Sequence, residues 1–247
     1  MSRIIFSIYT NNIDTDHTST NAYKRNQFEV YNDMIWNAQK EYADLCDADY
    51  TCVTASHTSF DDVQHQKMKQ LENFCRVYDE ILYIDFDVVP QTDLNWFEEH
   101  DMNVINCYWK EKRKENYFGK MNVYTKTQAK KAMLLLDNEL SNDKIINTGV
   151  IGGGSSIISR LRYRERLDYC DYLLDMAKND EMYPEEMSSM WESNNEVYTS
   201  YIIERYRIPN HEMSIAWNFM LDELCPNPTS AAHFIHHVNK DFHLSFG

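Results

Sequence analysis

Regular alternation of apolar strands with amphipathic helices is the feature that most constrains the fold of this chain. The apolar run Arg3 to Tyr9 predicts a buried strand, and apolar residues at three- and four-residue spacing predict a helix over about Asn21 to Leu45. A second strand is expected at about 50–54, a second helix over about 59–77 and a third strand at 81–84. This order predicts a parallel sheet with right-handed crossovers, whose ligands bind beyond the carboxyl ends of the strands.

The second half of the chain has a less regular pattern, which predicts a mixture of helices and strands. We expect strands at 103–108, 144–151 and 231–236, and helices over 127–136, 156–178 and 196–205. The 247 residues are 43% hydrophobic and contain six glycines and five prolines, without a flexible linker, low-complexity tract or repeat. Because these apolar residues suffice for one sizeable core, the sequence predicts a single α/β domain over residues 1–247.

Charge and cysteine usage argue against several classes of function. The net charge of -15 disfavours a nucleic-acid partner, because phosphate binding requires a surface rich in Lys and Arg. The short basic run Lys110 to Lys114 is expected to be a solvated loop. Six well-separated cysteines without a CxxC pair favour reduced thiols over a zinc ribbon. We recognise no signal peptide and no transmembrane span of ~20 apolar residues, so a cytoplasmic location is expected.

The segment Tyr78 to Pro90 has the clearest chemical signature in the sequence. Its apolar residues end in Asp85-Phe86-Asp87. Side chains two residues apart in an extended chain lie on the same side, so the two carboxylates can share one cation while Phe86 points away. A divalent cation would remove their mutual repulsion, and oxygen ligands favour Mn²⁺ or Mg²⁺ over zinc. A surface turn is the alternative, but the position after a buried third strand favours a metal site.

This segment resembles the "YDxxLYxDxD" segment of the GT-A fold glycosyltransferases, and within them the glycogenin-like and lipopolysaccharide-galactosyltransferase-like group. The resemblance covers most of the chain and is strict at a few places. It implies a Rossmann-like, mostly parallel central sheet flanked by helices, with residues 1–107 as nucleotide-binding half and 108–247 as acceptor half. The implied reaction moves a sugar from a nucleotide-sugar donor, with UDP favoured, to a hydroxyl of a glycan, protein or glycolipid. Retention of the anomeric configuration is favoured.

The same resemblance implies several donor-binding residues. Ser7, Tyr9 and Thr10 match a nucleotide-binding first strand, in which Tyr9 would stack on the base. An ordinary core tyrosine is the alternative. Lys69 falls where the group has a lysine on the helix before the Asp-x-Asp strand, and Lys67 is its rival. A lysine at this place would meet the donor's phosphates as a point charge.

A third metal ligand is implied by a segment that resembles the group's "HFxGxxK". The run from His233 to Lys240 keeps the His-Phe pair and a lysine, but it lacks the glycine and has one extra residue. His233 matches the His-Phe pair, whereas His236 falls at the expected strand end, so both are candidate ligands beside the two acids. Lys240 would reach the leaving diphosphate. The Trp217-Asn218 pair resembles a "WN" segment, in which Trp217 is expected to be a core residue.

Three residues of the second half are candidate catalytic groups. The segment 146–150 resembles the group's "FNSGV", which would bring Asn147 to the sugar. Asn195 and Glu196 replace an acidic pair, usually Asp-Gln, and Glu196 could act as general base on the acceptor or stabilise an oxocarbenium-like centre by its charge. Alternatively, Glu196 is an acid at a helix N-terminus that favours the helix dipole. The glycines at 152–154 are expected to form a flexible turn.

Two other functions remain open at this stage. A phosphatase or phosphotransferase of the haloacid-dehalogenase class has a similar acidic loop after an apolar strand, although that loop lies near the start of those chains. A non-catalytic nucleotide-sugar-binding protein would keep the metal site without turning over a donor.

Overall fold

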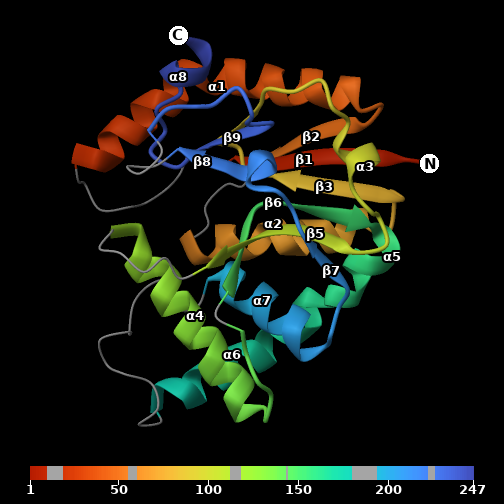
Figure 1. Ribbon diagram of the computed structural model, residues 1–247, viewed down its shortest axis with the longest axis vertical. Coiled ribbons are helices and arrows are strands. Elements are labelled where there is room, and N and C mark those ends of the chain that lie inside the picture. Colours follow the sequence, from red (N-terminus) through yellow and green to blue (C-terminus); the bar gives the residue numbers. More distant parts are fainter. Residues whose placement is uncertain (10–18, 55–59, 112–117, 143, 180–193, 222–225) are drawn as a thin grey trace.

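A six-stranded sheet forms the centre of the computed structural model, which describes residues 1–9, 19–54, 60–111, 118–142, 144–179, 194–221 and 226–247 (Figure 1). Its strand order is β2-β1-β3-β6-β5-β7. The strands are β1 (Arg3–Tyr9), β2 (Asp49–Thr54), β3 (Glu80–Ile84), β5 (Ile105–Glu111), β6 (Lys144–Gly154) and β7 (Asn210–Glu212). β1 pairs in parallel with β2 and β3, as does β5 with β7, whereas β6 is antiparallel to β3 and β5. The expected mostly parallel sheet is confirmed, with β6 as the reversed strand.

Helices cover both faces of this sheet (Figure 1). One face is covered by α1 (Ser19–Leu45) and α3 (Trp96–Glu99), and the other by α2 (Phe60–Phe74), α4 (Phe118–Leu136), α6 (Tyr163–Asn179) and α7 (Asn195–Arg205). Side chains of β1 alternate between the two cores, because successive residues of a strand point to opposite faces. Ile4 and Phe6 pack with the residues of α2, α4, α6 and α7, whereas Ile5 packs with those of α1 and α3. The sheet is therefore buried on both sides, as in other α/β domains.

A second, three-stranded sheet joins distant parts of the chain. Its order is β4-β9-β8, with β4 (Val88–Pro90), β8 (Phe219–Leu221) and β9 (Phe234–His237). β4 begins directly after Asp87 and is antiparallel to β9, so that Val88 lies opposite His236. This pairing brings a residue from position 236 to the turn that follows β3, which no local sequence pattern specifies.

Most expected elements of the second half are present with shifted bounds. The helices expected over 156–178 are α5 (Ser155–Ile158), the short 3-10 helix η1 (Ser159–Leu161) and α6, and Arg162 separates η1 from α6 with a left-handed backbone (φ 41°). The strand expected at 103–108 begins at Ile105, and the one expected at 231–236 begins at Phe234. The 3-10 helix η3 (Ile215–Asn218) and α8 (His243–Phe246) complete the described elements. Within the described residues, none of the helices combines the length and apolar character needed to cross a bilayer.

The flexible turn expected at residues 152–154 is wrong. These glycines lie inside β6, where they pair with Leu82, Ile81 and Glu80 of β3. A Cβ atom on Gly152 would lie 2.5 Å from the backbone oxygen of Ile81, and one on Gly154 would lie 2.6 Å from the oxygen of Met102. Neighbouring backbone therefore passes too close for any side chain, and this close approach, rather than flexibility, explains the glycines.

Candidate metal and donor-binding site

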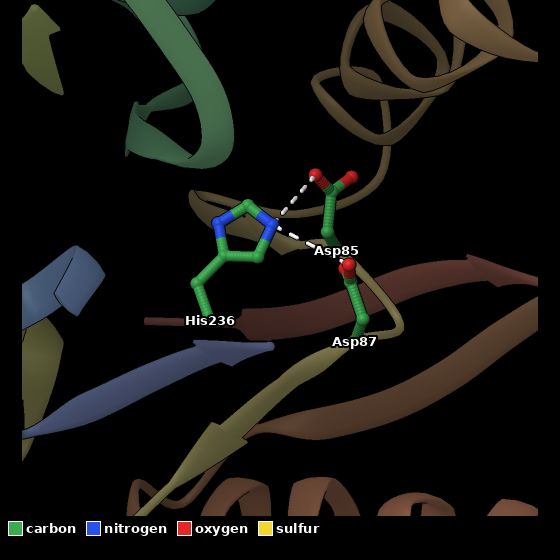
Figure 2. Close-up of side chains that lie close together, drawn as sticks. All are labelled: Asp85, Asp87 and His236. Carbon is green, nitrogen blue, oxygen red and sulfur yellow. Dashed lines mark ion pairs between the residues drawn. The ribbon is translucent and has the colours of Figure 1, made fainter. Parts of the chain in front are cut away.

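Two carboxylates and one imidazole meet at the turn between β3 and β4. Asp85 and Asp87 project from this turn and His236 projects from β9, and one ligand atom from each lies within 4.8 Å of the others. His236 Nε2 is 3.9 Å from Asp85 Oδ2 and 3.5 Å from Asp87 Oδ2. Figure 2 shows the imidazole directed at both carboxylates. Asp87 and His236 are buried, whereas 25% of the Asp85 side chain is exposed, so the cluster is accessible from one side.

The backbone of the acidic turn is held by hydrogen bonds from three directions. The Asp85 amide donates to Gly149 O of β6 (2.7 Å), and the Val88 amide donates to Asp85 O within the turn (2.9 Å). From α1, Gln39 Nε2 donates to Asp85 O (3.1 Å) and Val88 O (2.8 Å). The Gln39 carbonyl in turn accepts from the Tyr50 hydroxyl of β2 (2.8 Å). Both acids therefore project from a backbone that is fixed before any ligand binds.

Lysines compensate the charges of both acids. Lys67 Nζ of α2 is 3.2 Å from Asp85 Oδ1, and the Lys240 ammonium forms an ion pair with Asp87. Burial acts to raise the pKa of Asp87, but the Lys240 ammonium and the neighbouring His236 ring outweigh it and hold this pKa below its usual range. Asp87 is therefore a carboxylate at neutral pH. It is available as an anionic ligand.

Tyr83 supplies a further contact to the cluster from within β3. Its hydroxyl lies 2.5 Å from Asp85 Oδ1 and donates to it, since burial and the Asp85 charge raise the pKa of Tyr83 well above its usual value. The donor set as a whole fits a divalent cation, because it offers two carboxylates and an imidazole nitrogen. Tyr83 and Lys67 both donate hydrogen bonds to Asp85. Hydrogen bonds of this kind, from residues that do not touch the metal, commonly orient the side chains that do.

The structure brings Lys67, the rival candidate, to the acids, and it does not bring Lys69 there. The Lys67 residue is 6% exposed and its ammonium lies beside Asp85. Two helical positions that are two residues apart point about 200° away from each other, so Lys69 cannot share this direction. A helical lysine was expected at this place, but counting residues from Asp85 did not identify which side of α2 faces the site.

Of the two candidate histidines, the structure places His236 in the cluster. His233 precedes β9, and its ring packs on the Trp217 ring with 4.5 Å between the centroids. Three residues of extended chain correspond to about 10 Å, so the two histidines lie at opposite ends of the strand. Trp217 is 6% exposed and belongs to the core on the α1 side, as expected.

The residues expected to bind the nucleotide lie at the end of β1. Tyr9 is partly buried, and its ring centroid is 4.7 Å from that of Phe86, the residue between the two acids. Burial is the largest of the effects that raise the pKa of Tyr9. Ser7 is fully buried and its Oγ lies 3.0 Å from the Tyr50 hydroxyl oxygen. Thr10 lies outside the described residues. Phe86 thus packs on the tyrosine expected at the base, but residues 85–87 form a turn closed by the hydrogen bond from the Val88 amide to Asp85 O, not the extended chain that was expected.

The three candidate catalytic residues belong to a buried polar group next to the metal cluster. Glu196 Oε1 accepts from Asn147 Nδ2 (2.9 Å) and from the Thr148 amide (3.3 Å), while Oε2 lies 2.5 Å from Lys126 Nζ. Asn195 Nδ2 donates to Thr148 Oγ1 (2.9 Å). Glu196 also lies in the first turn of α7, which satisfies the helix-dipole interpretation of this acid.

Asn218 connects this polar group to the metal cluster. Its Nδ2 donates to Asn147 Oδ1 (2.6 Å), and its Oδ1 lies 2.9 Å from His236 Nδ1. The backbone is closely packed at the same point, because a Cβ atom on Gly149 would lie 2.6 Å from His236 Cε1. Sequence analysis noted the Trp-Asn pair but assigned no role to Asn218, and it gave no indication of Lys126.

Comparison with known proteins supports the fold. No protein-family model and no curated protein sequence matches the chain. A crystal structure of a glycosyltransferase involved in the glycosylation of the major capsid of PBCV-1 matches at 14% identity, with 98% of this chain and 100% of that chain covered and a TM-score of 0.50. The apo form of mouse xyloside xylosyltransferase 1 matches at 10% identity, covering 96% and 98% respectively, with a TM-score of 0.49. Together with the mixed sheet flanked by helices, the first match confirms the expected GT-A type of glycosyltransferase fold.

Proposed function

We propose that this protein is a metal-dependent glycosyltransferase that moves a sugar from a nucleoside-diphosphate sugar to a hydroxyl acceptor. The proposal rests on one observation, the cluster of Asp85, Asp87 and His236 with a lysine beside each acid, at the carboxyl end of β3 in a GT-A fold. Ligands of open α/β sheets bind at this end of the strands. We favour UDP as the nucleotide and Mn²⁺ or Mg²⁺ as the cation.

The cluster residues have separate roles in this proposal. Asp85, Asp87 and His236 hold the cation, which supplies Lewis acidity to the departing diphosphate when it is bound. Lys67 and Lys240 neutralise phosphate charge, since both ammonium groups already lie at the acids that the diphosphate must approach. In the same proposal, the ring of Tyr9 stacks on the base, and Ser7 and Thr10 belong to the nucleotide side.

The acceptor side is assigned to the buried polar group. Asn147, Asn195 and Glu196 are the proposed residues near the reacting sugar, and we favour electrostatic stabilisation over proton abstraction for Glu196. Both of its carboxylate oxygens already accept hydrogen bonds from Lys126, Asn147 and the Thr148 amide. These contacts occupy three of the roughly four acceptor positions of a carboxylate, whereas a general base needs a free lone pair within reach of the acceptor's proton. The acceptor is proposed to be a glycan, protein or glycolipid hydroxyl, with retention of configuration.

A donor-hydrolysis assay tests the proposal. The protein is incubated with a panel of nucleotide sugars, with Mn²⁺ or with a chelator, and released nucleoside diphosphate is measured. We expect release that requires the metal, that is lost in Asp87→Asn, and that persists in the control Asp93→Asn, which alters an exposed acid. Donor binding without release, even with candidate acceptors present, would instead indicate a binding protein. Cleavage of phosphate esters without any action on the donors would indicate a phosphatase and refute the transferase.

A further inference from the structure

A continuous chain of buried hydrogen bonds runs from the metal-facing histidine to an ion pair between α4 and α7. In order, it connects His236, Asn218, Asn147, Glu196 and Lys126. All five residues in this series of hydrogen bonds are buried, with at most 8% of their surface exposed. Because water does not compete for these groups, the direction of each hydrogen bond can be worked out from the groups at the fixed end.

The direction is set by backbone donors and by the ion pair. The Gly149 amide can only donate, so the Asn147 atom 3.0 Å from it must be the carbonyl oxygen, Oδ1. The other side-chain atom of Asn147 is then the NH₂ group, which donates to Glu196 Oε1. That oxygen is an acceptor, since the Thr148 amide also donates to it and Lys126 pairs with the same carboxylate. The orientation of the Asn147 amide is therefore fixed from two sides.

The remaining two hydrogen bonds follow from this orientation. Asn147 Oδ1 is an acceptor, so the Asn218 atom 2.6 Å away must be its NH₂ group. Asn218 then presents its carbonyl oxygen to His236 Nδ1 at 2.9 Å. A carbonyl oxygen cannot donate, so the proton of this hydrogen bond must be on His236 Nδ1. This series of hydrogen bonds excludes the neutral His236 tautomer that has its proton on Nε2.

This result bears on the metal cluster because Nε2 is the nitrogen that faces the two acids. Without a constraint on Nδ1, the nearby carboxylate of Asp87, 3.5 Å from Nε2, would favour a proton on Nε2. A proton at that position would block the lone pair that a cation needs. In metal sites, the second ring nitrogen of a ligating histidine commonly donates to a carboxylate or carbonyl, which fixes the ring and its tautomer.

We propose that Asn218 is a positioning residue that holds His236 in the form that offers Nε2 to a divalent cation, and that Asn147, Glu196 and Lys126 fix the orientation of Asn218. The inference rests on the cation site of the proposed function, but it does not depend on sugar transfer. Glu196 therefore acts on the cluster through the hydrogen-bond chain, in addition to any effect on the sugar.

The first test is spectroscopic and uses the wild-type protein without metal or donor. A proton–nitrogen correlation spectrum of histidine-labelled protein, recorded at about pH 8, above the usual histidine pKa of about 6.5, reports which ring nitrogen is protonated. The chain has nine histidines, and the His236 signals are those missing from the spectrum of His236→Gln. We expect a proton on Nδ1. A neutral ring protonated on Nε2 would overturn the inference whether or not the protein binds metal.

The second test measures Mn²⁺ affinity without a nucleotide, in two variants of Asn218. Asn218→Leu has a similar size but cannot accept from Nδ1, and it is expected to weaken Mn²⁺ binding by about 10–100-fold, the usual effect of losing such a partner. Asn218→Asp keeps an acceptor for Nδ1 but loses the donor to Asn147 Oδ1, so its Mn²⁺ affinity is expected to fall less than that of Asn218→Leu. Unchanged affinity in Asn218→Leu, or an equal loss in both folded variants, would contradict the proposed role.

Failure of the two proposals can be told apart. If the wild type binds Mn²⁺ but releases no nucleoside diphosphate from any donor, the transferase is refuted while the role of Asn218 stands. If the wild type binds no Mn²⁺, the cation site and the positioning role both fail. The His236 tautomer is then still decided by the spectrum of the wild type, which also serves if Asn218→Leu does not fold.

Discussion

Replacing Lys240 with Met is expected to change cation binding and diphosphate binding in opposite directions. The Lys240 ammonium pairs with Asp87, one of the proposed metal ligands, so a cation that binds alone must displace it from this carboxylate. When a diphosphate binds as well, the ammonium gains a new anionic partner. Lys240 should therefore oppose the binding of a cation alone and favour the binding of a cation together with a nucleoside diphosphate.

The size of the effect follows from the burial of the pair. The Lys240 and Asp87 side chains are 18% and 10% exposed, so solvent screens their interaction only weakly. A hydrogen bond to a charged group contributes about 1.5–3 kcal/mol, and each 1.4 kcal/mol corresponds to about a tenfold change in affinity. We therefore expect Lys240→Met to bind Mn²⁺ alone about 10–100-fold more tightly, and to bind UDP about 10-fold or more weakly at saturating Mn²⁺.

Both affinities can be measured by calorimetry on the same samples. Lys40→Met is a matched control, because Lys40 is an exposed lysine of α1 whose ammonium lies over the Trp36 ring, 5.2 Å from its centroid. This control removes the same charge and should alter neither affinity by more than about twofold, since an exposed lysine contributes little. Weaker or unchanged Mn²⁺ binding in Lys240→Met would refute the argument, because it would show that the ammonium does not compete with the cation.

Three further predictions concern the donor, the sheet and acid stability. Lys67→Met should weaken UDP binding at saturating Mn²⁺ by about tenfold, while Lys69→Met should leave it unchanged in the same titration. Gly152→Ala should lower the free energy of unfolding, measured with denaturant, by about 2 kcal/mol or more, because its Cβ would lie 2.5 Å from a backbone oxygen of β3. Burial acts to raise the pKa of Asp137, but hydrogen bonds from two tyrosines and Arg205 lower it overall. The contribution of Asp137 to the stability of the fold is therefore present above the unfolded pKa and is lost as pH falls through the folded pKa. Asp137→Asn should therefore unfold more easily than the wild type at neutral pH, and the difference should close as the pH falls below 3.8.

The first half of the fold could be predicted because its information is local. The periods of two and of about 3.6 residues are visible in β1, α1 and β3 themselves, and the order of the elements then constrains the sheet. The small sheet of β4, β8 and β9 could not be predicted in this way. Two of its strands have three residues each, too short for a pattern, and β9 takes its position from the distant β4.

In the candidate site too, some residues are indicated by a local sequence pattern, whereas others are brought to the site only by the fold. Asp85 and Asp87 could be predicted as a pair because only one residue separates them and they follow a buried strand. Lys67 could not be chosen over Lys69 without knowing which side of α2 faces the sheet. Asn218 and Lys126 reach the site only through hydrogen bonds to residues between 18 and 71 positions away in the sequence, so no spacing in the chain indicates them.

Gln39 illustrates a functional contribution that sequence patterns conceal. It lies on the apolar side of α1, between Ile35 and Tyr42, where a polar residue weakens the periodic pattern rather than indicating a role. In the structure, Gln39 is fully buried, and its amide donates to the backbone oxygens of Asp85 and Val88. A single α1 side chain thus supplies one of the three sets of hydrogen bonds that hold the turn from which both acids project.

Gln39→Leu keeps the volume of this side chain but removes its hydrogen bonds. Asp85 O keeps the Val88 amide as a donor, whereas Val88 O loses the Gln39 amide and the Tyr50 hydroxyl loses its Gln39 acceptor. An unsatisfied buried polar group costs about 1–3 kcal/mol, so we expect the free energy of unfolding to fall by about 2–4 kcal/mol. Mn²⁺ binding should weaken as well, because the turn would no longer hold Asp85 and Asp87 at a fixed distance from each other. The control Asn37→Leu changes an exposed position of the same helix, and it should leave Mn²⁺ affinity unchanged and stability within about 0.5 kcal/mol. Denaturant unfolding and Mn²⁺ titration of folded Gln39→Leu separate the two effects. Reduced stability with wild-type affinity would mean that Gln39 supports the fold but that β4 and Gly149 alone suffice to hold the acids.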